Sequence, residues 1–325
     1  MIEDFKSARL RIPPCLPPIW ASTGHLQTIL GNLLGSPALN EKGIKLNVTL
    51  DKEEERIQTI YLKGENKTVV YLFHGLAGTA DAAYMQRTAI ECRKLGYHVF
   101  LNNHRGCGEG MGLAFEPYHS GRAEDLSSVI AYGRKMLPDH HHVAVGFSLS
   151  ANALLLLAAG VRAEVLPDVA IAVNAPINLD EASINLTQGL NRIYNFRFMI
   201  ELRRHVKRNH PETFHMVKNV WELRNFDEAY TAPIGGFKNR ADYYKTCSAK
   251  QYLPGIKIPT VMLTAKDDPF VAYADYKDAS ISSCTLLHIE EHGGHMGYLT
   301  KEGKGYTRWL DLALREYLRT AGAQK

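Results

Sequence analysis

A series of short, continuous apolar segments most constrains the fold of this chain. They are rich in β-branched residues and do not alternate with polar positions, as expected of strands covered on both faces in a parallel sheet. They lie at residues 68–73, 97–101, 143–147, 169–173, 259–264 and 285–289. The intervening helical patterns lie at about residues 80–95, 120–137, 149–160, 270–281 and 305–319. Alternating strands and helices predict an α/β fold with a mostly parallel central sheet flanked by helices.

Two regions depart from this alternation and set the expected domain organisation. Prolines at positions 13, 14, 17 and 18 predict an irregular N-terminal arm over residues 1–40. Residues 178–250 contain helical stretches but no obvious strand, and we interpret them as a helical cap inserted into the core. The core then comprises residues 41–177 and 251–325, and the alternating segments 44–50 and 57–62 begin it as an edge hairpin.

Composition excludes several classes of partner. The chain is 45% hydrophobic and 22% charged, which is typical of a soluble globular protein. A net charge of +4 is too small to predict binding to nucleic acid or to an anionic membrane. No apolar run approaches the roughly 18 residues that a transmembrane helix needs. We therefore expect a small-molecule partner and no transmembrane segment, and no oligomeric state follows from these data.

Cysteine usage and the N-terminal residues predict a cytoplasmic protein. The five cysteines are widely spaced and form no C-x-x-C pair, so we expect free thiols in a reducing compartment. Glu3 and Asp4 come early and no long apolar segment follows them, so we expect no secretory signal.

The segment from Val143 to Ser150 reads as a buried strand, a sharp turn at Ser148 and the start of a helix. This is the layout of a nucleophile elbow, which holds one hydroxyl clear of the sheet edge. The usual pattern is G-x-S-x-G, whereas Ser150 occupies the last position here. Ser148 is the predicted nucleophile, and it requires a base and an acid further along the chain.

The acid is expected in the loop that follows the apolar segment 259–264. Asp267 and Asp268 lie there, directly before Pro269. The carboxyl end of a strand is where open α/β sheets bind ligands, although an aspartate at this position could also be a helix N-cap. Asp268 fits the usual spacing of the acid better, and Asp267 is the alternative.

The base is expected after the last apolar segment, where His292, Gly293, Gly294 and His295 follow one another. Glycines would let an imidazole project from a tight loop. We take His295 as the base and His292 as the alternative. These histidines and His288 could also suggest a metal site, but no other ligand spacing supports one. We therefore predict neither a metal nor a cofactor.

A fourth loop, from His74 to Gly78, follows the apolar segment 68–73. Acyl transfer needs backbone N–H donors for a developing oxyanion. In elbow sites one donor follows the nucleophile and the other comes from such a loop, which assigns them to Leu149 and Leu76. The glycine-rich residues 103–112 fit neither a dinucleotide fingerprint nor a phosphate loop, and we interpret them as a flexible loop bordering the site.

Further motifs extend over nearly the whole chain: HLQT at 25–28, HRGC at 104–107, YHSG at 118–121, NAP at 174–176, FDEAYTAP at 226–233 and DYY at 242–244. With the elbow, AKDDPF at 265–270 and HGGH at 292–295, they make the chain resemble the YheT-like branch of the α/β-hydrolase superfamily. That branch also contains medium-chain acyl ester synthase/esterases and related phospholipases. The resemblance implies an α/β-hydrolase fold and a Ser-Asp-His triad, which maps onto Ser148, Asp268 and His295.

The combined expectation is a serine carboxylic-ester hydrolase that acts on short- to medium-chain acyl esters through an acyl-enzyme. Apolar side chains of the cap could line an acyl site. They are Phe196, Phe198, Met199, Ile200, Phe214, Met216 and Trp221. The alternatives are an acyltransferase or ester synthase, a phospholipase-type lipid hydrolase with the same site, and a non-catalytic binding protein on a hydrolase fold.

Overall fold

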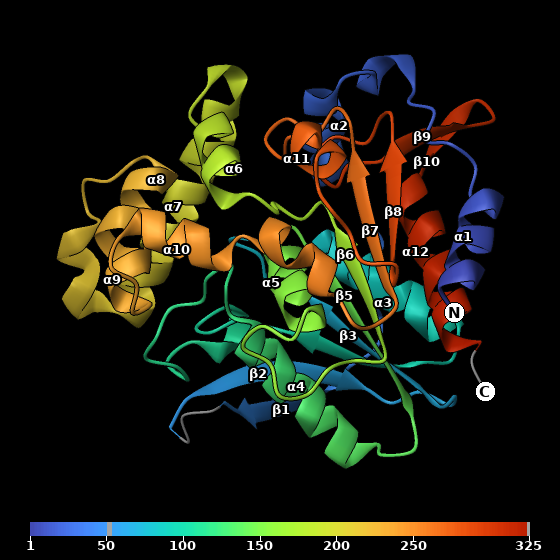
Figure 1. The fold of residues 1–325 in the computed structure, drawn as a ribbon, viewed down its shortest axis with the longest axis horizontal. Helices are drawn as coiled ribbons and strands as arrows, with labels where there is room; N and C mark the ends of the chain where they lie inside the picture. Colours follow the sequence, from blue (N-terminus) through green and yellow to red (C-terminus); the bar gives the residue numbers. More distant parts are fainter. Residues whose placement is uncertain (51–53, 324–325) are drawn as a thin grey trace.

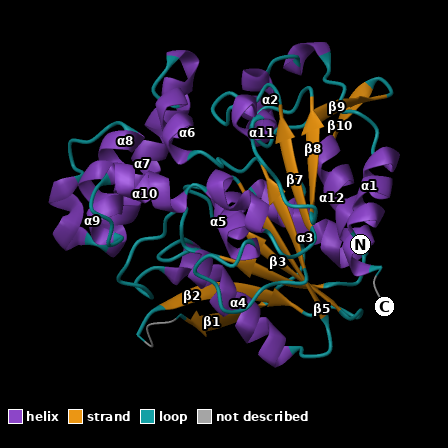
Figure 2. Ribbon diagram, in the orientation of Figure 1, coloured by secondary structure: helices purple, strands orange, loops and turns teal. Residues whose placement is uncertain are grey.

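An eight-stranded sheet forms the centre of the molecule, with strand order β1-β2-β4-β3-β5-β6-β7-β8 (Figures 1 and 2). The computed structural model describes residues 1–50 and 54–323; residues 51–53 and 324–325, which fall in the two predicted core segments, lie outside this description. The strands are β1 Ile44–Thr49, β2 Arg56–Leu62, β3 Thr68–Phe73, β4 His98–Asn102, β5 His141–Phe147, β6 Val169–Val173, β7 Thr260–Ala265 and β8 Thr285–Glu290.

The sheet is parallel from β4 to β8, and the antiparallel pair β1 and β2 forms one edge. The predicted mostly parallel sheet with an edge hairpin is therefore confirmed. β5 lies between β3 and β6, with Gly146 opposite Phe73 and Phe147 opposite Val173. Parallel strands end at the same edge of a sheet, so the loops after β3, β5, β6, β7 and β8 meet there.

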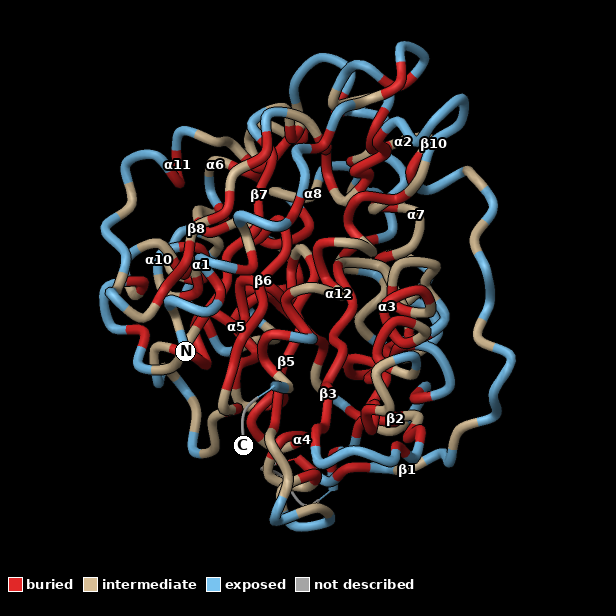
Figure 3. The backbone as a smooth tube through the Cα atoms, turned by 90° about the vertical axis from the view of Figure 1, so that its right-hand side faces the viewer, coloured by how far each residue is buried: buried red, intermediate tan, exposed pale blue. Residues whose placement is uncertain are grey.

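Helices cover both faces of the sheet and bury it almost completely (Figure 3). One face packs against α4 Ala123–Met136 and α5 Leu149–Ala158. The other packs against α1 Ile2–Arg11, α3 Ala83–Lys94 and α12 Trp309–Gly322. Side chains in β3 alternate between these two layers, with Tyr71 in the first and Val70 and Leu72 in the second. Burial on both faces explains why the strands read as continuous apolar segments.

Residues 178–250 contain helices and turns and, across the described chain, contribute no strand. The helices are α6 Leu179–Asn185, α7 Arg192–Asn209, α8 Leu223–Phe226, α9 Ala232–Ile234 and α10 Arg240–Cys247, with a π-helical turn at Asp227–Thr231 and 3-10 turns at Gly189–Asn191 and Pro211–Met216. This region lies beside the sheet and joins β6 to β7 (Figure 1). It has hydrophobic clusters of its own, one of which includes Met199, Val206 and Phe226.

The prediction of an irregular arm is wrong for most of residues 1–40. Helix α1 precedes the proline stretch and α2 Gly24–Leu33 follows it, with a 3-10 turn at Ile19–Ala21 between them. The prolines restrict only their own neighbourhood, and the residues on either side are free to form helices. Phe5 of α1 is fully buried, so tertiary packing rather than local pattern stabilises this helix.

Other differences concern element ends. The helix expected over residues 305–319 begins at Trp309, where its buried side chains begin, and an antiparallel hairpin of β9 Leu299–Glu302 and β10 Gly305–Arg308 precedes it. The helix expected over residues 270–281 is shortened to α11 Tyr273–Lys277. A 3-10 turn at Ala249–Gly255 leads from the helical region into β7.

Candidate active site

Ser148 lies at a sharp turn between β5 and α5. Its φ and ψ are 53° and −116°, a conformation that residues with a side chain rarely adopt. Two glycines allow this turn. A Cβ on Gly146 would lie 2.6 Å from the Ser150 carbonyl oxygen, and a Cβ on Gly75 would lie 3.0 Å from the Ser148 Cβ. Close approach of strand, helix and neighbouring loop therefore fixes where the Ser148 hydroxyl points.

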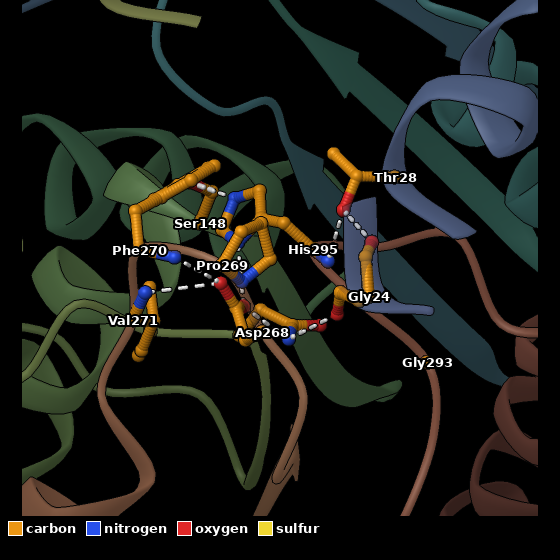
Figure 4. A network of polar contacts seen from close by, with 12 residues as sticks. Gly24, Thr28, Ser148, Asp268, Pro269, Phe270, Val271, Gly293 and His295 are labelled. Atoms are coloured by element: carbon orange, nitrogen blue, oxygen red, sulfur yellow. Dashed lines mark hydrogen bonds and ion pairs between the residues drawn. The ribbon is translucent and has the colours of Figure 1, made fainter. Parts of the chain in front are cut away.

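The structure brings Ser148, His295 and Asp268 into one continuous line (Figure 4). The His295 Nε2 lies 2.9 Å from the Ser148 Oγ, and the His295 Nδ1 lies 2.7 Å from the Asp268 Oδ2. The Asp268 side chain is fully buried and that of His295 is 9% exposed. Little water can therefore screen the contact between the carboxylate and the imidazole.

Both oxygens of Asp268 have fixed partners. Its Oδ1 accepts hydrogen bonds from the N–H groups of Phe270 and Val271, at 3.1 and 3.0 Å. Its Oδ2 also accepts one from the Asn174 amide, at 2.8 Å. The helix N-cap alternative is wrong for this aspartate, because the next helix, α11, begins at Tyr273 with Ala272 as its N-cap. One oxygen of Asp268 instead holds the turn that follows it, while the other faces His295.

Asp267 points elsewhere and holds the histidine loop. Its Oδ1 accepts hydrogen bonds from the N–H groups of Gly293 and Gly294, at 2.9 and 2.8 Å. Its Oδ2 lies 3.4 Å from His292, whose side chain is 42% exposed. No hydrogen bond among the described residues joins Asp267 or His292 to Ser148. Asp267 and His292, the alternatives for the acid and the base, therefore lie outside the line of contacts from Ser148 to Asp268.

Thr28 of α2 supports His295 from the N-terminal region, a role that the sequence analysis did not identify. Its Oγ1 accepts a hydrogen bond from the His295 N–H at 2.8 Å and donates one to the Gly24 carbonyl at 2.7 Å (Figure 4). A Cβ on Gly294 would lie 2.3 Å from that same carbonyl oxygen. The HLQT motif and the NAP motif, which contains Asn174, were the available signals, but no spacing rule linked them to the site.

In the loop after β3, the backbone N–H group of Leu76 has no acceptor among the described residues. Three neighbouring N–H groups do have acceptors: the Tyr84 hydroxyl for Gly75 (2.9 Å), the Tyr118 hydroxyl for Ala77 (3.0 Å) and the Gly75 carbonyl for Gly78 (3.1 Å). Leu149 is the first residue of α5, where N–H groups have no partner within the helix. Over the described residues, neither Leu76 nor Leu149 donates a backbone hydrogen bond.

Ser150, which replaces the usual last glycine of the elbow, is fully buried and hydrogen-bonded. Its Oγ lies 2.5 Å from the His104 Nε2 and donates to the His74 carbonyl. Burial lowers the pKa of His74 and of His104, so both imidazoles are neutral at pH 7. The departure from the usual pattern therefore adds a polar contact below the elbow, while Gly146 still allows the close packing.

The interpretation of residues 103–112 as a flexible bordering loop is wrong for their first half. Asn103, His104 and Arg105 are buried, and Arg105 makes a paired hydrogen bond with Asp125 at 2.7 and 2.6 Å. A glycine-rich composition indicates freedom of the isolated backbone, and tertiary contacts remove that freedom here.

A pocket of about 850 Å³, counting space open to solvent, extends from Ser148 between the sheet edge and the helical region. Its apolar wall includes Leu76, Leu149, Phe198, Leu202, Phe226 and Phe270. Of the seven side chains expected to line an acyl site, only Phe198 does so. Phe196 and Trp221 are about half exposed and stack on each other, whereas Met199 is fully buried in the helical cluster. The amino-acid composition of the cap did not show which of these side chains face the pocket.

The described residues contain neither a candidate metal site nor a membrane-spanning helix. Within residues 1–50 and 54–323, no group of three or more His, Cys, Asp or Glu side chains could hold a metal ion. His288, which the sequence placed near such a group, lies 2.8 Å from Glu290. No helix in the described parts of the chain is long and apolar enough to cross a bilayer.

Known proteins resemble this chain in sequence and fold. A family model described as alpha/beta hydrolase fold matches residues 68–302. Escherichia coli YheT, named as a candidate esterase, is 30% identical over 79% of this chain and 78% of its own length. The Saccharomyces cerevisiae monoacylglycerol lipase is 29% identical over 78% of this chain, which spans 59% of that protein.

The Pyrococcus furiosus esterase Pf2001 shares the fold, with a TM-score of 0.55 at 14% identity, over 81% of this chain and 91% of its own. The sheet order, the elbow between β5 and α5, and the extent of the family match agree with one another. This chain belongs to the α/β-hydrolase fold family, in its YheT-like branch.

Proposed function

We propose that this hydrolase is a serine carboxylesterase in which Ser148 is the nucleophile, His295 the general base and Asp268 the acid of the triad. One observation carries the proposal: the unbroken contacts from the Ser148 Oγ through the His295 ring to the Asp268 carboxylate. A serine hydroxyl is a weak nucleophile, and a base within hydrogen-bond distance is what activates it.

In the first half-reaction, the Ser148 Oγ attacks the ester carbonyl and its proton moves to the His295 Nε2. Negative charge develops on the carbonyl oxygen, where the free N–H groups of Leu76 and Leu149 donate hydrogen bonds. The bond between the carbonyl carbon and the alcohol oxygen then breaks. The departing alcohol takes the proton from His295, and the acyl group remains on Ser148.

In the second half-reaction, water attacks the acyl-enzyme and His295 accepts a proton from it. Collapse of the tetrahedral intermediate releases the carboxylic acid and returns the proton to the Ser148 Oγ. Asp268 remains ionised throughout, because its role is to orient the imidazole and stabilise the imidazolium. The hydrogen bonds from Phe270, Val271 and Asn174 keep this carboxylate in place.

For the substrate, we propose short- to medium-chain acyl esters. The pocket has an apolar wall next to Ser148, which suits an acyl chain. The yeast relative is named a monoacylglycerol lipase, which supports an ester of a lipid type. Transfer of the acyl group to an alcohol would use the same acyl-enzyme, so added alcohol should be included in the assay to detect ester synthesis. For location, free thiols at all five cysteines agree with a reducing compartment such as the cytoplasm.

The test is hydrolysis of p-nitrophenyl esters from acetate to dodecanoate by wild type and by Ser148→Ala. We expect kcat to fall by about 10⁴- to 10⁶-fold in the variant, because removal of a serine nucleophile leaves only binding and oxyanion contributions. Equal turnover by the two proteins would show that Ser148 is not the nucleophile. Absence of turnover by wild type on every ester would favour a binding protein.

A further inference from the structure

The π-helical turn Asp227–Thr231 is a feature that the proposed chemistry does not use. It belongs to the FDEAYTAP motif and lies on the wall of the pocket that starts at Ser148. π-Helical turns are rare and occur frequently at functional sites. This one brings Asp227, Tyr230 and Thr231 to a pocket lined by apolar side chains, such as Phe198 and Leu202, and by polar ones, such as His205.

Asp227 is a buried carboxyl group with few partners. Its side chain accepts a hydrogen bond from the Tyr244 hydroxyl at 2.8 Å, and Thr231 donates a second. Burial raises its pKa to about 6, so the group is mostly ionised at pH 7. An ionised carboxylate can accept about four hydrogen bonds, which leaves acceptor capacity at the pocket wall.

His205 of α7 is another polar residue that lines this pocket. Its Nδ1 lies 3.4 Å from the Asn209 side-chain nitrogen, which also donates to the Gly106 and His205 carbonyls. A donor facing Nδ1 favours the tautomer with the ring proton on Nε2. The Nε2 is buried and has no hydrogen-bond partner within the described chain. Burial, together with His210 and Arg208, lowers the pKa of His205 to about 4, so the ring is neutral. The pocket therefore has an acceptor at Asp227 and an unpaired donor at His205.

We propose that this wall is a hydroxyl-binding subsite, in which Asp227 accepts a hydrogen bond from a hydroxyl group of the substrate and His205 donates one to an oxygen. The ligand class is an ester that carries a free hydroxyl group away from the scissile carbonyl. This inference rests on the proposed esterase function for the reaction, whereas binding of a ligand at the subsite does not require catalysis. The hydroxyl group can belong to the acyl chain or to the alcohol part of the ester.

Two matched substrate pairs separate these sources. One pair is p-nitrophenyl hexanoate and p-nitrophenyl 6-hydroxyhexanoate, and the other is propyl hexanoate and 1-hexanoylglycerol. We expect wild type to prefer the hydroxylated member of at least one pair by about tenfold or more in kcat/KM, since sites with polar groups reject analogues that leave those groups unpaired. Asp227→Leu should abolish the preference.

The control is Glu228→Gln, which alters the neighbouring exposed carboxylate of the same turn, outside the pocket lining. It should keep the preference. If Asp227→Leu does not fold, Asp227→Asn and His205→Phe provide the same comparison. A variant that lowers kcat/KM for both members of a pair equally would show a structural role and overturn the proposal, as would a wild type without preference.

A binding measurement separates this inference from the proposed function. Ser148→Ala and the double variant Ser148→Ala/Asp227→Leu are titrated with the same esters. If wild type turns over no ester but Ser148→Ala binds the hydroxylated member about tenfold more tightly through Asp227, the subsite stands and the esterase proposal falls. If wild type hydrolyses esters but neither kcat/KM nor binding depends on Asp227, the esterase proposal stands and the subsite proposal falls.

Discussion

The loops at the sheet edge and the helical region around residues 178–250 position their polar groups in different ways. At the sheet edge, backbone groups hold the site: N–H groups of Phe270 and Val271 bind Asp268, and the N–H of His295 binds Thr28. In the helical region, the Asp227 and His205 side chains contact other side chains, and the His205 Nε2 has no partner among the described residues.

This difference indicates a division of labour. Backbone hydrogen bonds fix a catalytic group within a few tenths of an ångström, which proton transfer requires. The polar side chains of the helical region line the pocket without touching the triad, a position that suits the selection of a substrate. We therefore expect changes at the sheet edge to reduce turnover of every ester, and changes in the helical region to alter the ranking among esters.

The largest effect should come from Asp268→Asn. Loss of the carboxylate removes the charge that stabilises the His295 imidazolium, and kcat should fall by about 10⁴-fold. Asp267→Asn is the matched control, since its amide oxygen can still accept the N–H groups of Gly293 and Gly294, and we expect less than about a tenfold loss. Steady-state kinetics on p-nitrophenyl butyrate measures both. The reverse order would assign the triad acid to Asp267.

A smaller effect is expected for Thr28→Val, which removes the acceptor for the His295 N–H without changing side-chain size. Leaving that buried donor unpaired costs about 1–3 kcal/mol. We expect kcat to fall by about 10- to 100-fold if the cost falls on the position of His295, with rescue by Thr28→Ser. Urea unfolding of each variant measures the part that falls on stability. A valine variant with unchanged kcat and stability would show that this contact does not support the site.

The smallest effect is expected for Phe198→Ala in the helical region. The side chain lines the pocket, so its loss should reduce kcat/KM for p-nitrophenyl octanoate by about tenfold through lost apolar burial. The acetate ester should be hydrolysed as before. Phe196→Ala, on the same helix but about half exposed, is the control and should leave both rates unchanged. An equal loss on both esters would instead place Phe198 in the support of the catalytic groups.

Much of the fold was predictable because each strand is buried on both faces. Continuous apolar segments located six of the eight strands of the sheet, and the alternating pair 44–50 and 57–62 located the other two. The helices of residues 1–40 were missed because packing stabilises them more than their local pattern does. The hairpin β9–β10 was missed because its strands are short and half exposed, which leaves little apolar periodicity.

For the site, residue types and chain order determined which side chains to consider. A serine in an elbow pattern after an apolar strand, an aspartate pair before proline and a histidine in a glycine-rich loop are local features. The sequence alone therefore named Ser148 and His295, and it favoured Asp268 over Asp267 on spacing. The choice between Asp267 and Asp268 is different, because neighbouring residues share the same local chemistry. Only tertiary structure shows which carboxylate faces His295, since that depends on how the loops after β7 and β8 meet.

Tertiary structure alone also brought Thr28 and Asn174 to the site and placed Asp227 on the pocket wall. These residues are far from Ser148 in the chain, and no periodicity connects them with it. Local sequence encodes strands, turns and side-chain chemistry, whereas contacts between distant segments arise only when the sheet and the helices that cover it are assembled.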